Sequence, residues 1–275
     1  MSTTIVLDRV EVSPDVVLPY AETGSPEGAP ILLLHGLTDS WRSFEPVLPY
    51  LAPEIRAIAL TMRGHGDASR PQSGYDWPTL VSDLSAVLDA LNIGNAILVG
   101  HSYGSLVAMH AAVLAPARVS GLVLMGAFTP RPELPLMRRL WDDIVSTLDD
   151  PVPPAVATEF QESTLARPVV PGIIDTAIAE RLKLPARVWK AVFEPLLTMD
   201  LLDSLRRYKG PVRLIWGDRD AMATATDQAN LLEAFPYALL CAHPGAGHAL
   251  HWEDPESVAD QISEFVLANS RLPGR

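Results

Sequence analysis

The sequence predicts an α/β protein with a doubly wound, mostly parallel sheet and an inserted helical cap. Three observations lead to this fold class. Short apolar runs typical of buried strands alternate with helical stretches along most of the 275 residues. One junction between a strand and a helix carries the pattern Gly-x-Ser-x-Gly, at residues 100–104. The alternation stops between residues 128 and 207, where only helical stretches occur.

The strand-like runs form two groups. Residues 4–23 predict an antiparallel pair at one edge of the sheet. Six further apolar runs predict parallel strands, at 31–34, 56–60, 96–99, 122–125, 212–216 and 238–242. Between them, residues 77–91 place their leucines on one face, as an amphipathic helix does. In such a sheet the functional loops follow the carboxyl ends of the parallel strands.

Ser102 is the predicted nucleophile. An apolar run precedes it and an Ala- and Leu-rich helical stretch, 105–114, follows it, so the serine stands on a sharp turn. Gly100 and Gly104 suit that turn because a β-carbon at either position would clash with the neighbouring strand and helix. The alternative role for Ser102 is a helix N-cap. The two glycines and both flanks favour the nucleophile.

A serine hydroxyl needs a base to act as a nucleophile at neutral pH. Of the seven histidines, His248 is the candidate base, because it lies on a Gly-rich loop directly after a strand-like run. That position reaches the same edge of the sheet as Ser102. His243 and His251 are the local alternatives, and His251 is more typical of a structural role. His101 adjoins the nucleophile but is expected to point elsewhere.

Two aspartates follow the strand-like run 212–216, and either could orient the His248 imidazole. Asp220 lies further along the loop and has more freedom to turn toward His248. Asp218 follows a glycine directly, a position where aspartate often binds the loop backbone. The residues favour Asp220 and leave Asp218 open.

An oxyanion hole is predicted from two backbone amides. Leu37 follows the strand-like run 31–34 and Gly36, which allows close approach of the backbone to a substrate. The second donor is the amide of Tyr103, directly after the nucleophile. His35 is expected to hold this loop by hydrogen bonds.

The helical stretches at 136–148, 155–165, 173–181 and 186–194 are expected to form the cap, residues 128–207. Residues 1–127 and 208–275 would then form the core. A cap over the strand ends would roof the pocket. Its aromatic side chains are candidate substrate contacts and would favour a hydrophobic substrate, although amphipathic helices also bury aromatics in their own core. They are Trp141, Phe160, Trp189 and Phe193.

Taken together, these motifs resemble the α/β-hydrolase superfamily, in its branch of cap-bearing serine hydrolases that includes esterases and lactonases. The matching segments are 35–36, 62–69, 100–104, 217–220, 247–248 and 252–256. The resemblance implies the order Ser, Asp, His along the chain and places the acid at Asp220. It also implies acyl-enzyme chemistry, because related enzymes that cleave carbon–halogen bonds or epoxides carry aspartate at the elbow.

Composition narrows the partners. The net charge of −12 and the absence of a basic cluster argue against nucleic acid and anionic membranes. No Cys/His metal pattern or phosphate-binding glycine loop is present, so no metal or cofactor is expected. The single cysteine, Cys241, excludes an intrachain disulfide, and no signal peptide or long apolar run is visible. These features predict a protein of the cytoplasm, and the scarcity of lysine, found only at Lys183, Lys190 and Lys209, favours a bacterial origin.

Three functions remain open on the sequence alone. The favoured function is hydrolysis of a hydrophobic carboxylic ester or lactone by Ser102, His248 and Asp220. The second is hydrolysis of a carbon–carbon bond in a vinylogous diketone, which Ala249 after the histidine disfavours because those enzymes tend to carry a large aromatic residue there. The third is a ligand-binding sensor with slow turnover. The oligomeric state is left open.

Overall fold

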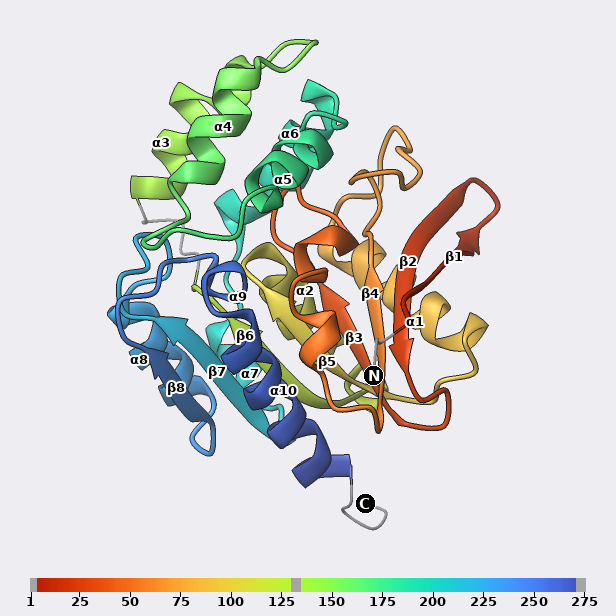
Figure 1. The fold of residues 1–275 in the computed structure, drawn as a ribbon. Helices are drawn as coiled ribbons and strands as arrows, with labels where there is room; N and C mark the ends of the chain where they lie inside the picture. The colour runs from red at the N-terminus through yellow and green to blue at the C-terminus, as the bar shows by residue number, and fades with distance from the viewer. Residues whose placement is uncertain (1–3, 130–134, 271–275) are drawn as a thin grey trace.

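The computed structural model describes residues 4–129 and 135–270. In this part of the chain an eight-stranded sheet forms the centre, with strand order β1-β2-β4-β3-β5-β6-β7-β8 (Figure 1). β1 pairs antiparallel with β2, and β2 pairs antiparallel with β4, whereas all later pairs are parallel. This arrangement confirms the predicted α/β fold with its mostly parallel sheet. The strands are β1 (Val6–Ser13), β2 (Val16–Gly24), β3 (Ala29–Leu34), β4 (Ile55–Leu60), β5 (Ala96–His101), β6 (Val119–Met125), β7 (Val212–Gly217) and β8 (Leu239–His243).

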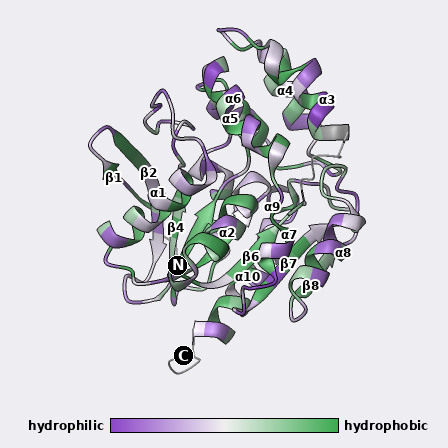
Figure 2. Ribbon diagram, turned by 180° about the vertical axis from the view of Figure 1, so that it is seen from behind, coloured by the Kyte–Doolittle hydropathy of each residue, from purple (hydrophilic) through white to green (hydrophobic). Residues whose placement is uncertain are grey.

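The central strands are apolar on both faces because helices cover both. In β3, Leu32 and Leu34 face one hydrophobic cluster, whereas Ile31 and Leu33 face the other. The first cluster takes side chains from α1 (Trp77–Ala90), α2 (Tyr103–Leu114), α7 (Leu202–Leu205) and α8 (Ala225–Ala234). The second packs β3 and its neighbours against α10 (Pro255–Ser270) and the 3-10 helices η1 (Trp41–Phe44) and η2 (Leu48–Tyr50). Figure 2 shows the resulting concentration of hydrophobic residues in the central strands and α2.

Local sequence explains several boundaries. Asp76 caps α1, accepting a hydrogen bond from the Thr79 amide. Thr224 and Asp227 form a reciprocal capping box at the start of α8. At most of their ends, the predicted helix 77–91 and the predicted parallel strands lie within one or two residues of the observed elements.

Between β6 and β7 the described residues, 126–129 and 135–211, form helices and irregular segments without a strand, and Figure 1 shows α3–α6 gathered at one end of the sheet. These helices are α3 (Pro135–Asp143), α4 (Pro154–Glu162), α5 (Ile173–Arg181) and α6 (Ala186–Phe193), followed by η5 (Glu194–Thr198). The predicted helix 173–181 coincides with α5. The predicted helix 136–148 is shorter, because the backbone at Ile144 leaves helical geometry and a 3-10 turn, Val145–Thr147, follows. The domain boundaries at 128 and 207 stay predictions.

Candidate active site

Ser102 lies on the turn between β5 and α2, with backbone angles φ 52° and ψ −117°. A positive φ is costly for serine, so the surroundings must hold the turn. A β-carbon at Gly100 would lie 2.4 Å from the carbonyl oxygen of Gly104, and one at Gly104 would lie 2.1 Å from that of Leu34. Only glycine fits either position, and the resulting tight turn presents Ser102 at the carboxyl end of β5.

Three predicted residues meet at this edge of the sheet. The Ser102 hydroxyl oxygen lies 2.8 Å from Nε2 of His248, and Nδ1 of that ring lies 2.8 Å from Oδ2 of Asp220. His248 comes from the loop after β8 and Asp220 from the loop after β7. When the proton of the neutral ring is on Nδ1 and is hydrogen-bonded to Asp220, Nε2 is free to accept the proton of the serine hydroxyl.

The Asp220 carboxylate is fixed by backbone amides as well as by His248. Its Oδ1 accepts hydrogen bonds from the amides of Met222 and Ala223, each at 2.8 Å. Burial alone would raise the pKa of Asp220, but the neighbouring His248 and these amide hydrogen bonds hold the pKa below its ordinary value. Asp218 instead binds its loop, accepting from the Gly245 amide at 2.5 Å. The structure therefore pairs Asp220, and not Asp218, with His248.

The two amides predicted to bind an oxyanion belong to residues next to the nucleophile. Tyr103 is the first residue of α2, and Leu37 lines the same chamber as Ser102. Among residues 4–129 and 135–270, neither amide takes part in the backbone hydrogen bonds of the turns and loops. His35 fixes the loop as predicted, with Nδ1 donating to the Gly36 carbonyl oxygen at 2.8 Å and Nε2 accepting from the Met62 amide at 3.0 Å.

The chamber at Ser102 is small, with a volume of about 20 Å³. Its core side is formed by Gly36, Leu37, His101, Ser102 and His248. The inserted helices contribute Phe160 and Gln161 from α4, Thr164 just after it, and Arg181 from the end of α5. Residues from the core loops and from the inserted helices thus enclose the serine together.

Comparison with known proteins settles the family. A family model described as "Alpha/beta hydrolase family" matches residues 31–261. The chain belongs to the alpha/beta hydrolase family. The hydrolase is 28% identical to 2-(acetamidomethylene)succinate hydrolase of Mesorhizobium japonicum, over 94% of this chain and 95% of that protein.

Solved structures agree on the fold. The hydrolase superimposes on an esterase from Rhodococcus sp. with a TM-score of 0.80 at 27% identity, covering 98% of this chain and 100% of that one. An esterase from Exiguobacterium antarcticum gives a TM-score of 0.83 at 21% identity, with 95% of this chain and 100% of that one covered. At the lower identity the likeness shows the fold alone.

Of the four aromatic side chains predicted to contact substrate, only Phe160 lines the chamber of the hydrolase. Trp189 and Phe193 are 2% exposed and pack in the hydrophobic core, and Trp141 stacks on Phe193 with ring centroids 6.1 Å apart. This placement corrects the prediction for Trp141, Trp189 and Phe193. The physical reason is that α3 and α6 turn their aromatic faces inward, where burial stabilises the inserted helices.

Arg181, which no sequence motif indicated, adds a charged group to the wall of the chamber. Arg181 is 1% exposed, and its Nη2 donates to the Leu37 carbonyl oxygen and to Oδ1 of Asp39, each at 3.3 Å. Burial lowers the pKa of Arg181 to about 10, so the guanidinium keeps its charge at neutral pH. Burial also raises the pKa of Asp39, against the opposing effect of Arg181. The inserted helices therefore present both an aromatic ring, that of Phe160, and a charged group, that of Arg181, to the chamber.

His101, which was expected to point away from the adjacent Ser102, hydrogen-bonds the backbone of His248 instead of the nucleophile. Its side chain lines the chamber, and Nε2 donates to the backbone carbonyl oxygen of His248 at 3.0 Å. Burial, reinforced by the neighbouring His248, lowers the pKa of His101 to about 3, so this ring is neutral. The available signal was a histidine at the end of an otherwise apolar strand.

His251 has the structural role that was predicted for it. It is fully buried, and its Nε2 lies 3.0 Å from the Ser43 hydroxyl. His243 pairs instead with Gln261, with Nε2 2.7 Å from the amide nitrogen. Neither ring contacts Ser102, which leaves His248 as the histidine at the nucleophile.

Residues 4–129 and 135–270 contain no cluster of three or more His, Cys, Asp or Glu side chains arranged to hold a metal ion. They also contain no helix of the length and apolarity that crossing a bilayer requires.

Proposed function

We propose that the protein is a serine hydrolase that cleaves a carboxylic ester or lactone of a hydrophobic small molecule through an acyl-enzyme. The observation that carries the proposal is the hydrogen-bonded row from Ser102 through His248 to Asp220, with two distances of 2.8 Å. A histidine within hydrogen-bond reach of a serine, and oriented by a carboxylate, is the arrangement that activates a serine nucleophile.

The proposed reaction has two halves. Ser102 Oγ attacks the ester carbonyl while His248 Nε2 takes its proton, and the amides of Leu37 and Tyr103 bind the oxygen that becomes negative. His248 then protonates the departing alcohol oxygen, which leaves an acylated Ser102. In the second half His248 removes a proton from water, the water attacks the acyl carbon, and Ser102 leaves with the proton. Asp220 holds the ring and stabilises its cationic form.

The test is turnover of p-nitrophenyl esters, aryl esters and aliphatic lactones, with Ser102→Ala as the blank. Hydrolysis by the wild type that Ser102→Ala abolishes, at an unchanged melting temperature, supports the proposal. Absence of turnover on the whole panel contradicts it and favours the carbon–carbon hydrolase or the sensor. A ligand that raises the melting temperature without being turned over would favour the sensor.

A second candidate keeps the same triad but takes a substrate with a carboxylate. Arg181 lines the chamber, and its Nε donates to no group within the described residues. One relative also carries succinate in the name of its substrate. Comparison of p-nitrophenyl hemisuccinate with p-nitrophenyl butyrate, which has an acyl chain of equal length, tests this candidate. A preference of at least about tenfold for the hemisuccinate would support it, since a charged hydrogen bond is worth about 1.5–3 kcal/mol.

A further inference from the structure

The chamber around Ser102 is much smaller than an ester, and a far larger cavity lies beside it. The chamber's volume of about 20 Å³ is room for about one water molecule. The neighbouring cavity has a volume of about 510 Å³, within the range of about 300–1,000 Å³ that small-molecule sites occupy. A substrate that reaches Ser102 must therefore have most of its body outside the chamber.

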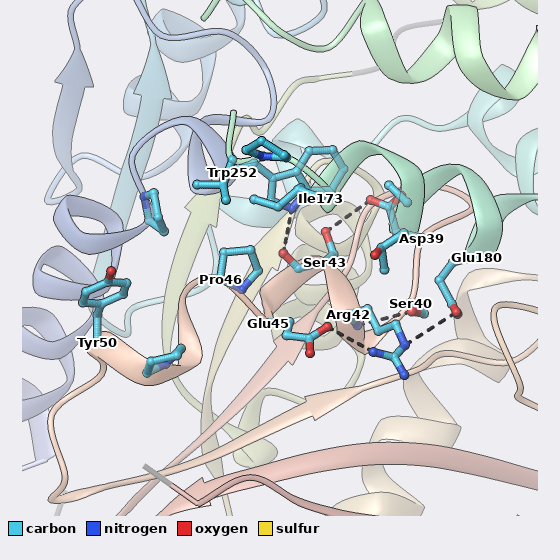
Figure 3. Close-up of a pocket in the computed structure, with 17 residues that line it drawn as sticks. Asp39, Ser40, Arg42, Ser43, Glu45, Pro46, Tyr50, Ile173, Glu180 and Trp252 are labelled. Atoms are coloured by element: carbon cyan, nitrogen blue, oxygen red, sulfur yellow. Dashed lines mark hydrogen bonds and ion pairs between the residues drawn. The ribbon is translucent and has the colours of Figure 1, made fainter. Parts of the chain in front are cut away.

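A thin wall separates the two spaces. The side chains of Asp39 and Trp252 line both the chamber and the cavity. Ser43 holds both of them, because its hydroxyl donates to Oδ2 of Asp39 at 3.3 Å and its carbonyl oxygen accepts from Nε1 of Trp252 at 2.8 Å. Figure 3 shows Ser43 between the two side chains. A substrate that passes between Asp39 and Trp252 would join the cavity to the nucleophile.

The charged groups of the cavity are already paired within the protein. Arg42 lies 3.1 Å from Glu45 and 3.7 Å from Glu180, and Lys183 lies 2.7 Å from Glu180. Asp39 is paired with Arg181 in the same way. Figure 3 shows Arg42 reaching toward both glutamates on one side of the cavity. Every charged group that lines the cavity itself is thus paired, so the cavity offers no unmatched charge among the described residues to select an ionic ligand; Arg181 lines the chamber and not the cavity.

Apart from the hydroxyl groups of Ser40, Ser43 and Thr176, most of the remaining wall is apolar. Pro46 and Tyr50 come from the core, Ile173 and Ala177 from α5, and Trp252 from α9 (Leu250–Glu253). Figure 3 shows Trp252 and Ile173 side by side on the wall opposite Pro46. Paired charges and mostly apolar walls together favour an uncharged alkyl or aryl group in the cavity, because such a group loses no hydrogen bonds to water when it is buried.

We propose that this cavity, between η1, η2 and α5, binds the apolar alkyl or aryl part of the substrate while the ester carbonyl occupies the chamber at Ser102. The inference rests on the proposed ester hydrolysis and adds the place and the chemical class of the non-reacting part. It moves the predicted substrate contacts away from the aromatic side chains of α3 and α6.

The experiment measures kcat/KM for p-nitrophenyl acetate, butyrate, hexanoate and octanoate in the wild type and in Thr176→Trp. Thr176 lines the cavity from α5, so the indole would fill it. In the wild type, kcat/KM should rise by about fourfold per added methylene group. In Thr176→Trp the rise should be lost, while acetate turnover stays. A parallel series from ethyl to octyl acetate shows whether the alcohol side, rather than the acyl side, occupies the cavity.

The matched control is Ala179→Trp, on the same helix, where the side chain is exposed and does not line the cavity. It should keep the wild-type dependence on chain length. Ile173→Trp provides a second filling variant if Thr176→Trp does not fold, as judged by its melting temperature. Equal chain-length profiles in the filling variants, the control and the wild type would overturn the proposal.

A binding measurement separates this proposal from the reaction itself. Titration calorimetry with 2-undecanone, an uncleavable ketone with a long alkyl chain, is performed on Ser102→Ala with and without Thr176→Trp. Binding that weakens at least tenfold on filling, but not with Ala179→Trp, supports the cavity even if no ester is hydrolysed. Equal binding in both proteins, or no binding to either, contradicts it.

Discussion

Arg181, at the end of α5, donates a hydrogen bond to the carbonyl oxygen of Leu37, the residue whose amide we propose as an oxyanion donor. The same Nη2 also donates to Asp39, so one side chain from the inserted helices is hydrogen-bonded to the loop after β3 at two points. Thr38 lies between these points with φ 65°, a strained angle that such contacts help to hold. The position of the inserted helices and the geometry of the oxyanion loop are thereby coupled.

Substitution of Arg181 should therefore impair catalysis of neutral esters as well as stability. We expect Arg181→Met to lower kcat by about 10²-fold with a smaller change in KM. The reason is that a displacement of the oxyanion loop by about 1 Å is enough to lower the rate of the chemical step by that factor. Steady-state kinetics with p-nitrophenyl butyrate measures both constants. Unchanged kcat would show that Arg181 does not position the loop.

A double variant separates the two effects of Arg181. Arg181→Met leaves the buried Asp39 carboxylate unpaired, which should lower the free energy of unfolding by about 3–5 kcal/mol. Arg181→Met with Asp39→Leu removes both charges and should recover most of that stability in urea unfolding. If it also recovered wild-type kcat, the loss in the single variant would be a consequence of instability alone.

The acid of the triad can be tested by a matched pair of substitutions. Asp220→Asn should lower kcat by about 10³–10⁴-fold, because an amide cannot hold His248 in the required tautomer or stabilise its cation. Asp218→Asn keeps an acceptor for the Gly245 amide and should have little effect on kcat. Kinetics of both variants at equal melting temperature decide the assignment. A larger loss in Asp218→Asn would contradict it.

The extent of agreement between sequence and structure follows from how local each signal is. The elbow was predictable because the strand, the two glycines and the helix are all within 20 residues of Ser102. The parallel strands were predictable because both faces of β3 and β5 are buried, which makes them continuous apolar runs. Asp220 and His248 followed from the rule that functional loops leave the carboxyl ends of such strands.

The roof of the site was not predictable in the same way. Whether an aromatic residue of an amphipathic helix faces the chamber or the helix's own core depends on how the helix rotates, and the periodicity is the same in both cases. Arg181 was missed for a related reason, since its partners Leu37 and Asp39 are more than 140 residues away in the sequence. Only the packed structure brings an arginine at the end of α5 to the loop after β3.

The elbow glycines provide a stability prediction with an internal control. Gly104→Ala should destabilise the fold by more than about 4 kcal/mol, because the new β-carbon would lie 2.1 Å from the Leu34 carbonyl oxygen. Gly94→Ala, before β5, meets nothing within 4 Å and should change stability by less than about 1 kcal/mol. Urea unfolding measures both. A stable, fully active Gly104→Ala protein would contradict the described geometry of the turn.

The buried histidines predict a loss of stability in mild acid. Burial lowers the pKa of His65 and His110 to about 4 and that of His101 to about 3, and it lowers the pKa of His35 and His251 as well. Below the ordinary pKa of 6.5, the unfolded chain therefore binds protons that the folded protein does not. The free energy of unfolding should fall as pH decreases from 6.5 toward 4, by up to about 1.4 kcal/mol per pH unit for each ring.

His110 is the ring with which to test this relation, because it stacks on Trp77 with ring centroids 4.2 Å apart and lies outside the chamber. Burial raises the pKa of Asp39, so protonation of this carboxyl increases the free energy of unfolding as pH falls. This opposing contribution is the same in the wild type and the variant. His110→Gln should therefore reduce the slope of unfolding free energy against pH by about one proton between pH 6 and 5, or about 1.4 kcal/mol per pH unit. Guanidinium unfolding at several pH values measures the two slopes. Identical slopes would show that His110 titrates normally in the folded protein, and that its burial does not contribute to acid sensitivity.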